Sequence, residues 1–391
     1  SPATAKNVLS VGALESLLFL TTQAVVTNID MTLSTNQAFL PATDSDDQVA
    51  AFSSRGNIEI GTEGEAGRFK PDVVAPGGFL ISARSKYWKF TGGTNAAENQ
   101  VLEQVNPLLG PSYRYESGTS MAAPVVSGML ALMQEFFEQR LPAALRRTNS
   151  PALMKALIIH GARSAGSLYD TYPKSTINYQ GWGLVNITNS LPALMATQPE
   201  AAWPIRLFDQ NPTNALATGQ TKSWNVGLSI DAQQVPLRLT LVWTDPPGNP
   251  TAGIKLVNDL DLVVSNSVTH QVYFGNNTPV SSDFTQVSET NSPPATDVIN
   301  NVENIIIREP FGSNFVVSVV GHKVNVPAVS DFNSATAKDA DVVQDFALVI
   351  STGDTTLTNA FTVTPVIDVP APPPPPPVVM TNGVPLLKQR V

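Results

Sequence analysis

A loop of small residues runs into an apolar helix in the segment Glu116-Ser117-Gly118-Thr119-Ser120-Met121-Ala122-Ala123-Pro124-Val125-Val126-Ser127-Gly128. Beyond Ser120, apolar residues recur with the i, i+3, i+4, i+7 spacing of a buried helical face, at Val126, Met129, Leu130, Met133 and Phe136. A serine at a helix start exposes its hydroxyl and directs its backbone N–H toward developing negative charge. We expect Pro124 in the first turn, where a missing N–H costs little, and close backbone approach at Gly118 and Gly128.

On its own, the tripeptide Gly118-Thr119-Ser120 is explained by a helix N-cap. The whole segment, however, closely resembles the nucleophile segment of the subtilisin-like serine proteases, the subtilases of peptidase family S8. Further blocks of that family follow in family order: Lys6-Asn7, Val11-Gly12-Ala13, Phe52-Ser53-Ser54-Arg55-Gly56, Lys70-Pro71-Asp72-Val73, Ala75-Pro76-Gly77 and, after the helix, Gly181-Trp182-Gly183. The resemblance implies that Ser120 is the acylating nucleophile, which needs an adjacent base and an orienting carboxylate.

Composition sets limits on the class of protein. At 391 residues the chain should hold two domains with sizeable cores. The net charge of −9 argues against nucleic acid or an anionic membrane as partner. The absence of cysteine excludes disulfides and thiolate metal sites, and it fits an exported bacterial protein. No apolar run is predicted to span a membrane.

Changes in hydrophobic periodicity and composition along the sequence predict three parts. Residues 1–200 are predicted to be the C-terminal part of a subtilisin-like parallel-sheet domain, with a helix at 151–161 capped by Ser150. Residues 201–366 show short alternating runs between turns, which predicts an antiparallel β-sandwich. The predicted strands are 237–243, 260–264, 272–274, 302–307, 315–320 and 346–350. Residues 367–391, with six prolines at 372–377, are interpreted as a stiff spacer.

Two polar insertions interrupt the first part, at residues 15–48 and 92–112, and we expect surface excursions with a hairpin around 24–33. The β-sandwich resembles the jelly-roll domain appended to one subtilase branch, which is related to the P domain of kexin-like proteases. The fold class is therefore expected to be α/β, the C-terminal half of a subtilisin-like domain, plus an all-β antiparallel jelly roll.

The resemblance places the catalytic Asp, the His and the oxyanion Asn before Ser1, because subtilases carry these three ahead of the nucleophile. None of the histidines in this chain inherits the role by position. His160 ends a predicted helix, where a cationic or hydrogen-bonding side chain complements the helix dipole. His270 and His322 are interpreted as strand-edge surface residues. Ser120 is thus a nucleophile without a triad in this chain.

Three explanations remain open. The chain is the C-terminal product of a nicked protease whose N-terminal companion stays docked, or a partial sequence of a longer enzyme, or a subtilase scaffold kept for assembly or binding. The first two predict a companion segment that completes the catalytic domain and leave the chain alone inactive and unstable. The substrate would be a polypeptide. The pocket for substrate side chains is not assigned. We expect Gly92-Gly93 and the loop before Ser117 to border the cleft.

A metal site is predicted in the second part, where Asp245, Asn258, Asp259 and Asp261 stand near strand ends. Carboxylate and carbonyl oxygens at turns suit Ca²⁺, and related appended domains bind calcium. The alternative is that these acids cap turns, although Asp259 and Asp261 share one strand face, where like charges are unfavourable without a cation.

The first functional hypothesis is a secreted, extracellular, bacterial serine endopeptidase of the subtilisin type. The second is a catalytically inactive structural or assembly protein derived from a subtilase. A third, a module that binds saccharide or a cell surface, finds no clear exposed stacking platform among Trp243, Tyr273 and Phe274.

Overall fold

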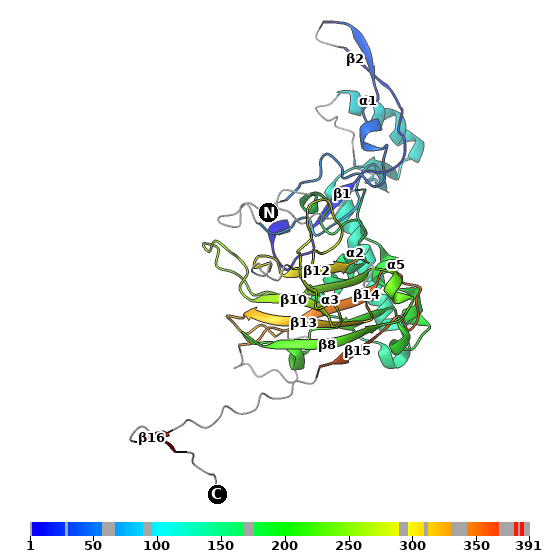
Figure 1. Cartoon of the computed structure of the whole chain (residues 1–391). Helices are drawn as coiled ribbons and strands as arrows, with labels where there is room; N and C mark the ends of the chain where they lie inside the picture. The colour runs from blue at the N-terminus through cyan, green and yellow to red at the C-terminus, as the bar shows by residue number, and fades with distance from the viewer. Residues whose placement is uncertain are drawn as a thin grey trace.

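The computed structural model describes residues 2–27, 30–56, 67–88, 96–166, 176–288, 296–308, 312–329, 342–366, 379–381 and 384–386. Gly92-Gly93 and the six prolines at 372–377, about which the sequence made predictions, lie outside these ranges. Within them the protein combines a small parallel sheet and helices with two larger antiparallel sheets (Figure 1). The α/β character of the first part is therefore confirmed.

The α/β part is organised around two parallel strands, β1 (Val11–Leu14) and β4 (Val73–Pro76). Helix α2 (Thr119–Glu135) packs against both strands and continues as a π-helical turn (Phe136–Arg140). Helix α3 (Pro151–Gly161) begins at the predicted cap, where the Ser150 hydroxyl accepts a hydrogen bond from the Leu153 N–H at 3.1 Å. Two short helices follow, α4 (Ile177–Gln180) and α5 (Ile187–Ser190).

The two insertions fold together instead of forming separate irregular excursions. They contribute the hairpin β2 (Ala24–Thr27) and β3 (Leu33–Asn36) and helix α1 (Ala96–Val105). The antiparallel pair β5 (Leu80–Ala83) and β6 (Tyr113–Glu116), which the predicted insertions did not include, flanks the second of them. We call residues 16–48 and 79–116 the inserted lobe. It has its own small core, in which the Phe79 ring lies 4.7 Å from Phe39 and 4.6 Å from Tyr115. Figure 1 shows β2 and α1 projecting from the rest of the molecule.

The second part is a pair of antiparallel sheets. One has the order β11-β10-β13-β8-β15, and the other has the order β12-β9-β14-β7. The strands are β7 (Ile205–Phe208), β8 (Thr221–Leu228), β9 (Leu237–Val242), β10 (Asp259–Asn266), β11 (Val272–Phe274), β12 (Val302–Ile307), β13 (Asn314–Lys323), β14 (Ala347–Thr352) and β15 (Phe361–Pro365). The six predicted strands are confirmed within three residues at each end. The jelly-roll topology and the domain boundaries at 200 and 366 stay predictions.

The sequence patterns missed β7, β8 and β15. Strand β8 reads Thr-Lys-Ser-Trp-Asn-Val-Gly-Leu, so only Trp224, Val226 and Leu228 face the core and no apolar run marks it. Strand β15 at the sheet edge buries only its first residue, Phe361. Near the C-terminus, β16 (Val379–Thr381) pairs with β17 (Val384–Leu386).

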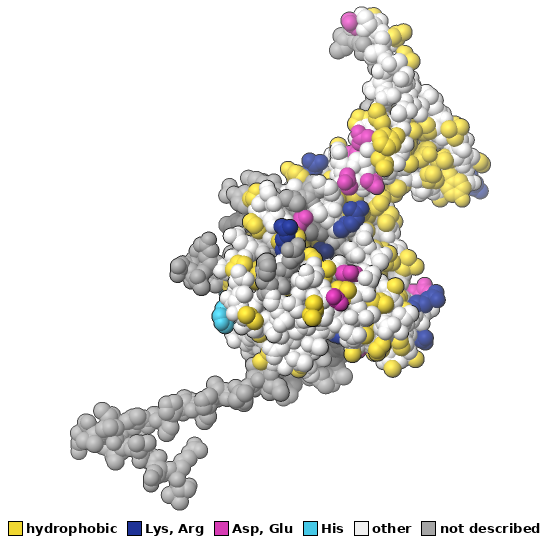
Figure 2. Space-filling model, turned by 45° about the vertical axis from the view of Figure 1, so that its right-hand side comes forward, with side chains coloured by type: hydrophobic (Ala, Val, Ile, Leu, Met, Phe, Trp, Pro, Cys, Tyr) yellow, Lys and Arg dark blue, Asp and Glu magenta, His cyan; other side chains and the backbone are white. Residues whose placement is uncertain are grey.

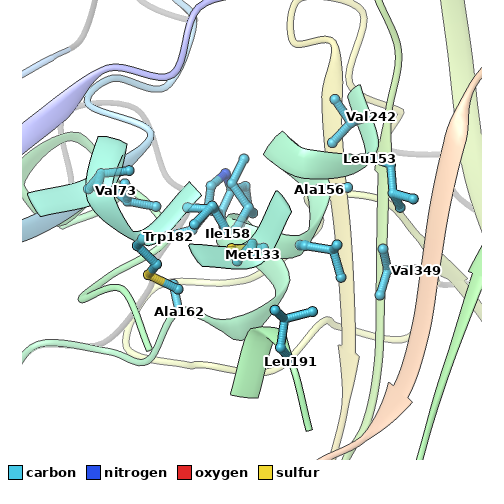
Figure 3. Close-up of a cluster of buried hydrophobic side chains, with 14 of the residues drawn as sticks. Val73, Met133, Leu153, Ala156, Ile158, Ala162, Trp182, Leu191, Val242 and Val349 are labelled. Atoms are coloured by element: carbon cyan, nitrogen blue, oxygen red, sulfur yellow. The ribbon is translucent and has the colours of Figure 1, made fainter. Parts of the chain in front are cut away.

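The α/β part and the sandwich share one hydrophobic core. Figure 3 shows Leu153 and Ala156 on the side of the cluster where Val242 of β9 and Val349 of β14 lie. Helix α3 is buried along most of its length because it packs against β9 and β14 of the four-stranded sheet and against α5. The two parts are therefore joined by buried apolar surface, the dominant favourable term in folding.

Buried charges complete this junction. Lys155 on α3 pairs with Asp72 at 3.0 Å, and Lys70 reaches the other oxygen of the same carboxylate at 2.6 Å. Lys6 pairs with Asp245, which lies just beyond strand β9 of the sandwich. Burial by itself raises the pKa of Asp72. The charges of Lys155 and Lys70 lower it by more than burial raises it, so the pKa lies below its usual value. Burial lowers the pKa of Lys155 to about 8 against the opposing effect of Asp72.

The remaining helical turns are 3₁₀-helices at Pro2–Thr4, Leu40–Ala42, Asn106–Leu109, Ala143–Leu145, Ala193–Ala196, Glu200–Ala202, Pro212–Asn214 and Ala232–Gln234.

Candidate active site

The loop that delivers Ser120 is fixed to the carboxyl end of β4. The Gly118 N–H donates to the Gly77 carbonyl at 2.8 Å, and the Ser117 hydroxyl accepts from the Phe79 N–H at 2.8 Å. A Cβ on Gly77 would lie 2.6 Å from the Ala13 Cβ and 3.0 Å from the Gly118 carbonyl oxygen. Glycine is therefore required at position 77 for the loop to approach the parallel strands this closely.

Ser120 lies in the first turn of α2 and is exposed. In the described ranges its hydroxyl has no hydrogen-bond partner. The first-turn N–H groups of a helix lack intrahelical acceptors, so the backbone N–H of Ser120 is oriented toward any negative charge that develops beside the hydroxyl. The structure therefore places an exposed hydroxyl and a first-turn backbone N–H together at this position, and the role of Ser120 as nucleophile stays a prediction.

Two expectations about neighbouring residues are wrong. Pro124 lies inside α2, one turn further along than predicted, so its missing N–H leaves the Ser120 carbonyl without the usual i→i−4 bond. A Cβ on Gly128 would meet nothing within 4 Å in the described structure, so no backbone approaches there. The sequence indicated small residues but could not show which of them a neighbour contacts.

The histidines lie away from Ser120. His160 is 2% exposed, and its Nδ1 lies 2.9 Å from Thr240 Oγ1 while Nε2 lies 2.6 Å from Ser351 Oγ. Burial and then the Arg238 charge lower the pKa of His160 well below its usual value, so the ring is neutral. The sequence offered His160 either a cationic or a hydrogen-bonding role, and the structure shows hydrogen bonds, which connect α3 to the sandwich. His270 and His322 are exposed and belong to the sandwich.

The outer side of α2 is apolar and uncovered in the described structure. Val125 is 40% exposed and Leu132 57%, whereas Ala122, Val126 and Met133 face the core. With its π-helical turn, the helix Thr119–Arg140 is long and apolar enough to cross a membrane by length and composition, a possibility that the sequence patterns missed. Its packing on β1 and β4 is that of a core helix with one open side.

The four predicted metal ligands do not form one set. The Asp245 carboxylate pairs with Lys6 and accepts from the Val257 N–H at 3.0 Å and the Asn258 N–H at 2.7 Å. The Asn258 amide oxygen accepts from two backbone N–H groups of residues 325 and 326. Both side chains are therefore occupied by hydrogen bonds that hold the end of β9 to neighbouring loops.

Asp259 and Asp261 lie near Glu303 of β12, and we call these three residues the sandwich acidic cluster. Each has one buried carboxylate oxygen without a hydrogen-bond partner in the described structure. Burial first, and the neighbouring carboxylates next, raise the pKa of Asp259 to about 7 and that of Glu303 well above its usual value. Burial also raises the pKa of Asp261, although His322 at 2.9 Å opposes it. Over the described ranges, no three acidic or histidine side chains are arranged to hold a metal ion.

The sequence patterns also missed a charged face beside the nucleophile loop. Arg84, directly after β5, and Arg114 on β6 stack on Trp88, with Cζ 4.7 and 4.8 Å from the ring centroid. Arg114 also pairs with Glu116. The alternation Tyr113-Arg114-Tyr115-Glu116 is a period-two strand signal that predicts one charged and one aromatic face.

Comparison with known proteins identifies the family to which the first part of the chain is related. Residues 1–183 match the Peptidase_S8 family, described as the subtilase family. That part of the chain is subtilase-related, and at the level of the family the protein is related to subtilisin-type serine proteases.

Individual relatives carry corresponding names. The serine protease/ABC transporter B family protein tagD of Dictyostelium discoideum is 28% identical over 67% of this chain. Serine protease AprX of Bacillus subtilis (strain 168) is 33% identical over 39% of the chain, and subtilisin-like protease SBT6.1 of Arabidopsis thaliana is 30% identical over 43%. The chain covers only 15%, 27% and 13% of these three proteins, respectively.

Proposed function

We propose that the protein acts as a serine endopeptidase of the subtilisin type in which Ser120 is the nucleophile. The observation that carries the proposal is the exposed Ser120 hydroxyl in the first turn of α2, on a loop fixed to the carboxyl end of β4. Ligand sites in parallel α/β sheets lie at this end of the strands. The family match supports the same reaction class.

In the proposed reaction, Ser120 Oγ attacks the scissile carbonyl carbon while a histidine base accepts the hydroxyl proton. The Ser120 N–H stabilises the oxyanion, a donor of the kind whose loss costs about 10²–10³ in rate. Collapse of the tetrahedral intermediate expels the amine and leaves an acyl-enzyme, which water hydrolyses.

We further propose that a companion segment supplies the histidine base, its carboxylate and a second oxyanion donor. Two observations support this idea. None of the three histidines lies beside Ser120, and α2 presents an uncovered apolar side next to a sheet with only two described strands. A segment that covers Val125 and Leu132 would add strands to the sheet and bury this surface.

Labelling with a fluorophosphonate probe tests both proposals. The chain alone should label weakly at Ser120, and the same chain combined with its companion segment should label strongly. Ser120→Ala should abolish the label, while Ser127→Ala, an exposed serine two turns along the same helix, should not. Strong labelling of the chain alone would contradict the need for a companion. Absence of labelling in the complete assembly would favour the structural or assembly protein that the sequence left open.

We also propose that the protein binds calcium and that it is exported. Calcium at Asp259 and Asp261 is supported by their unpaired buried oxygens, whereas the occupied side chains of Asp245 and Asn258 do not fit a shared site. Export is supported by the absence of cysteine and can be checked by fractionating the producing cells.

A further inference from the structure

The strand that leads to Ser120 carries its charged side chains on one face. In the antiparallel pair β5–β6, Ser82 lies opposite Arg114 and Leu80 lies opposite Glu116, while the Arg84 N–H donates to the Ser112 carbonyl at 2.7 Å. Opposite residues point to the same side of a sheet, so Arg84, Arg114 and Glu116 share one face. The other face, with Phe79 and Tyr115, packs into the core of the inserted lobe.

Both arginines on the charged face are held in place by Trp88. Stacking on an indole fixes a guanidinium plane and leaves its N–H donors at the edge free to bind a carboxylate. Arg114 uses donors on Glu116, and both side chains of that pair remain more than a quarter exposed. Arg84 has no carboxylate partner within the described part of the chain. The face therefore has an uncompensated positive charge in a protein of net charge −9.

This charged face lies within reach of a bound polypeptide. Arg114 stands six residues before Ser120, and an extended chain rises about 3.3 Å per residue, so the two are at most roughly 20 Å apart. A substrate residue within about six positions of the scissile bond spans that distance. Figure 2 shows basic and acidic side chains gathered where the lobe joins the rest of the molecule.

We propose that Arg84, stacked on Trp88 beside Arg114, is a specificity-determining residue that binds an aspartate or glutamate side chain of the polypeptide substrate. The inference rests on the proposed peptidase function. The carboxylate accepts hydrogen bonds from the free edge of the Arg84 guanidinium, a charge-assisted pairing stronger than one between neutral groups. Binding also relieves the repulsion between two neighbouring cations that Glu116 compensates only in part.

Matched peptides that differ only by Glu or Gln at one position test the subsite. With the complete assembly, kcat/KM should favour Glu by roughly tenfold at one position within six residues of the cleaved bond, and added salt should reduce that ratio. Arg84→Gln should lower the ratio to about one. Arg140→Gln, which removes an exposed arginine at the far end of α2, is the matched control and should leave the ratio unchanged.

A binding assay on Ser120→Ala protein tests the Arg84 subsite independently of the proposed peptidase reaction. Fluorescein-labelled Glu and Gln peptides are titrated onto Ser120→Ala protein, with and without Arg84→Gln. A preference for Glu that depends on Arg84 would uphold the subsite even if wild-type protein cleaved nothing and Ser120 took no probe. Equal affinity and equal kcat/KM for Glu and Gln at every position, or a Glu preference that survives Arg84→Gln, would overturn it.

Discussion

At the scale of single residues, burial decides what the titratable groups do. Ser120 and His160 are the pair that a serine protease motif brings to mind, yet one is exposed at a helix start and the other is enclosed between α3 and the sandwich. A neutral ring that bridges two hydroxyls has a structural role. The same reasoning applies to the sandwich acidic cluster, where buried carboxyls keep protons that an exposed carboxyl would release.

His160→Ala should therefore destabilise the protein without changing the reactivity of Ser120. The substitution leaves Thr240 and Ser351 without their shared partner, at a cost of about 1–3 kcal/mol in the free energy of unfolding. Urea denaturation measures this loss, and probe labelling of the complete assembly should stay at the wild-type level. His270→Ala, at an exposed turn, is the control with no expected effect. A selective loss of labelling in His160→Ala would restore His160 as a candidate base.

The sandwich acidic cluster should make stability depend on pH. The pKa of Asp259 is raised to about 7 in the folded state, so the folded protein binds more protons than the unfolded chain above pH 4. The contribution of Asp259 to stability is complete below its unfolded pKa and is lost as pH rises through about 7. Asp259→Asn should remove this loss, so the variant gains stability relative to wild type between pH 5 and 8 in calcium-free buffer.

Calcium would act on the same oxygens. If Ca²⁺ binds the cluster, it should raise the melting temperature of wild type at pH 7.5, and Asp259→Ala should abolish the rise. If the oxygens hold protons alone, calcium should leave the melting temperature unchanged while the pH dependence persists.

At the scale of elements, the nucleophile loop depends on one close contact. Gly77 lets the loop residue Gly118 reach the end of β4, and the Ser120 turn follows from that anchor. Helix α2 then divides its residues between a buried side and an open side. The first turn of α2 thus carries Ser120, the proposed nucleophile, and the middle of the helix holds it to the sheet.

Gly77→Ala should disturb the position of Ser120, whereas Gly128→Ala should stabilise helix α2. The Cβ at position 77 collides with Ala13 and Gly118, so Gly77→Ala should displace the loop and lower probe labelling of the assembly at least tenfold. Gly128 lies in the middle of a helix with open space around its Cα, so Gly128→Ala should stabilise the chain alone by about 0.5–1 kcal/mol. Thermal denaturation gives the stabilities. Unchanged labelling in Gly77→Ala would show that the contact does not position Ser120.

At the scale of the whole molecule, the α/β part and the sandwich behave as one unit. Their shared core and the buried Lys6–Asp245 pair join the two parts directly, and Lys70, Asp72 and Lys155 form a further buried charge network within the α/β part. A buried ion pair adds little net stability, but removal of one partner leaves an uncompensated charge.

Asp72→Asn should accordingly cost about 3–5 kcal/mol in the free energy of unfolding, because it leaves Lys70 and Lys155 buried without their anionic partner. Glu135→Gln breaks the exposed pair with Arg140 and should cost less than about 1 kcal/mol. Helix circular dichroism and tryptophan fluorescence should report one coincident transition in wild type. Separate transitions by the two probes would mean that the parts unfold independently.

Local pattern was enough to predict the helix that begins at Ser120, the capped helix at 151–161 and six strands of the sandwich, because period and turn residues act over a few positions. The family came from the resemblance of several sequence blocks. Tertiary structure alone decided that two polar insertions lie in one lobe, that His160 is a buried bridge, that Asp245 pairs with Lys6, and that Arg84 and Arg114 meet on Trp88. Each of these depends on contacts between side chains in three dimensions, which no local period encodes. Ser120 belongs to both accounts, since its segment resembles the subtilase nucleophile segment and the structure shows the residue exposed in the first turn of α2.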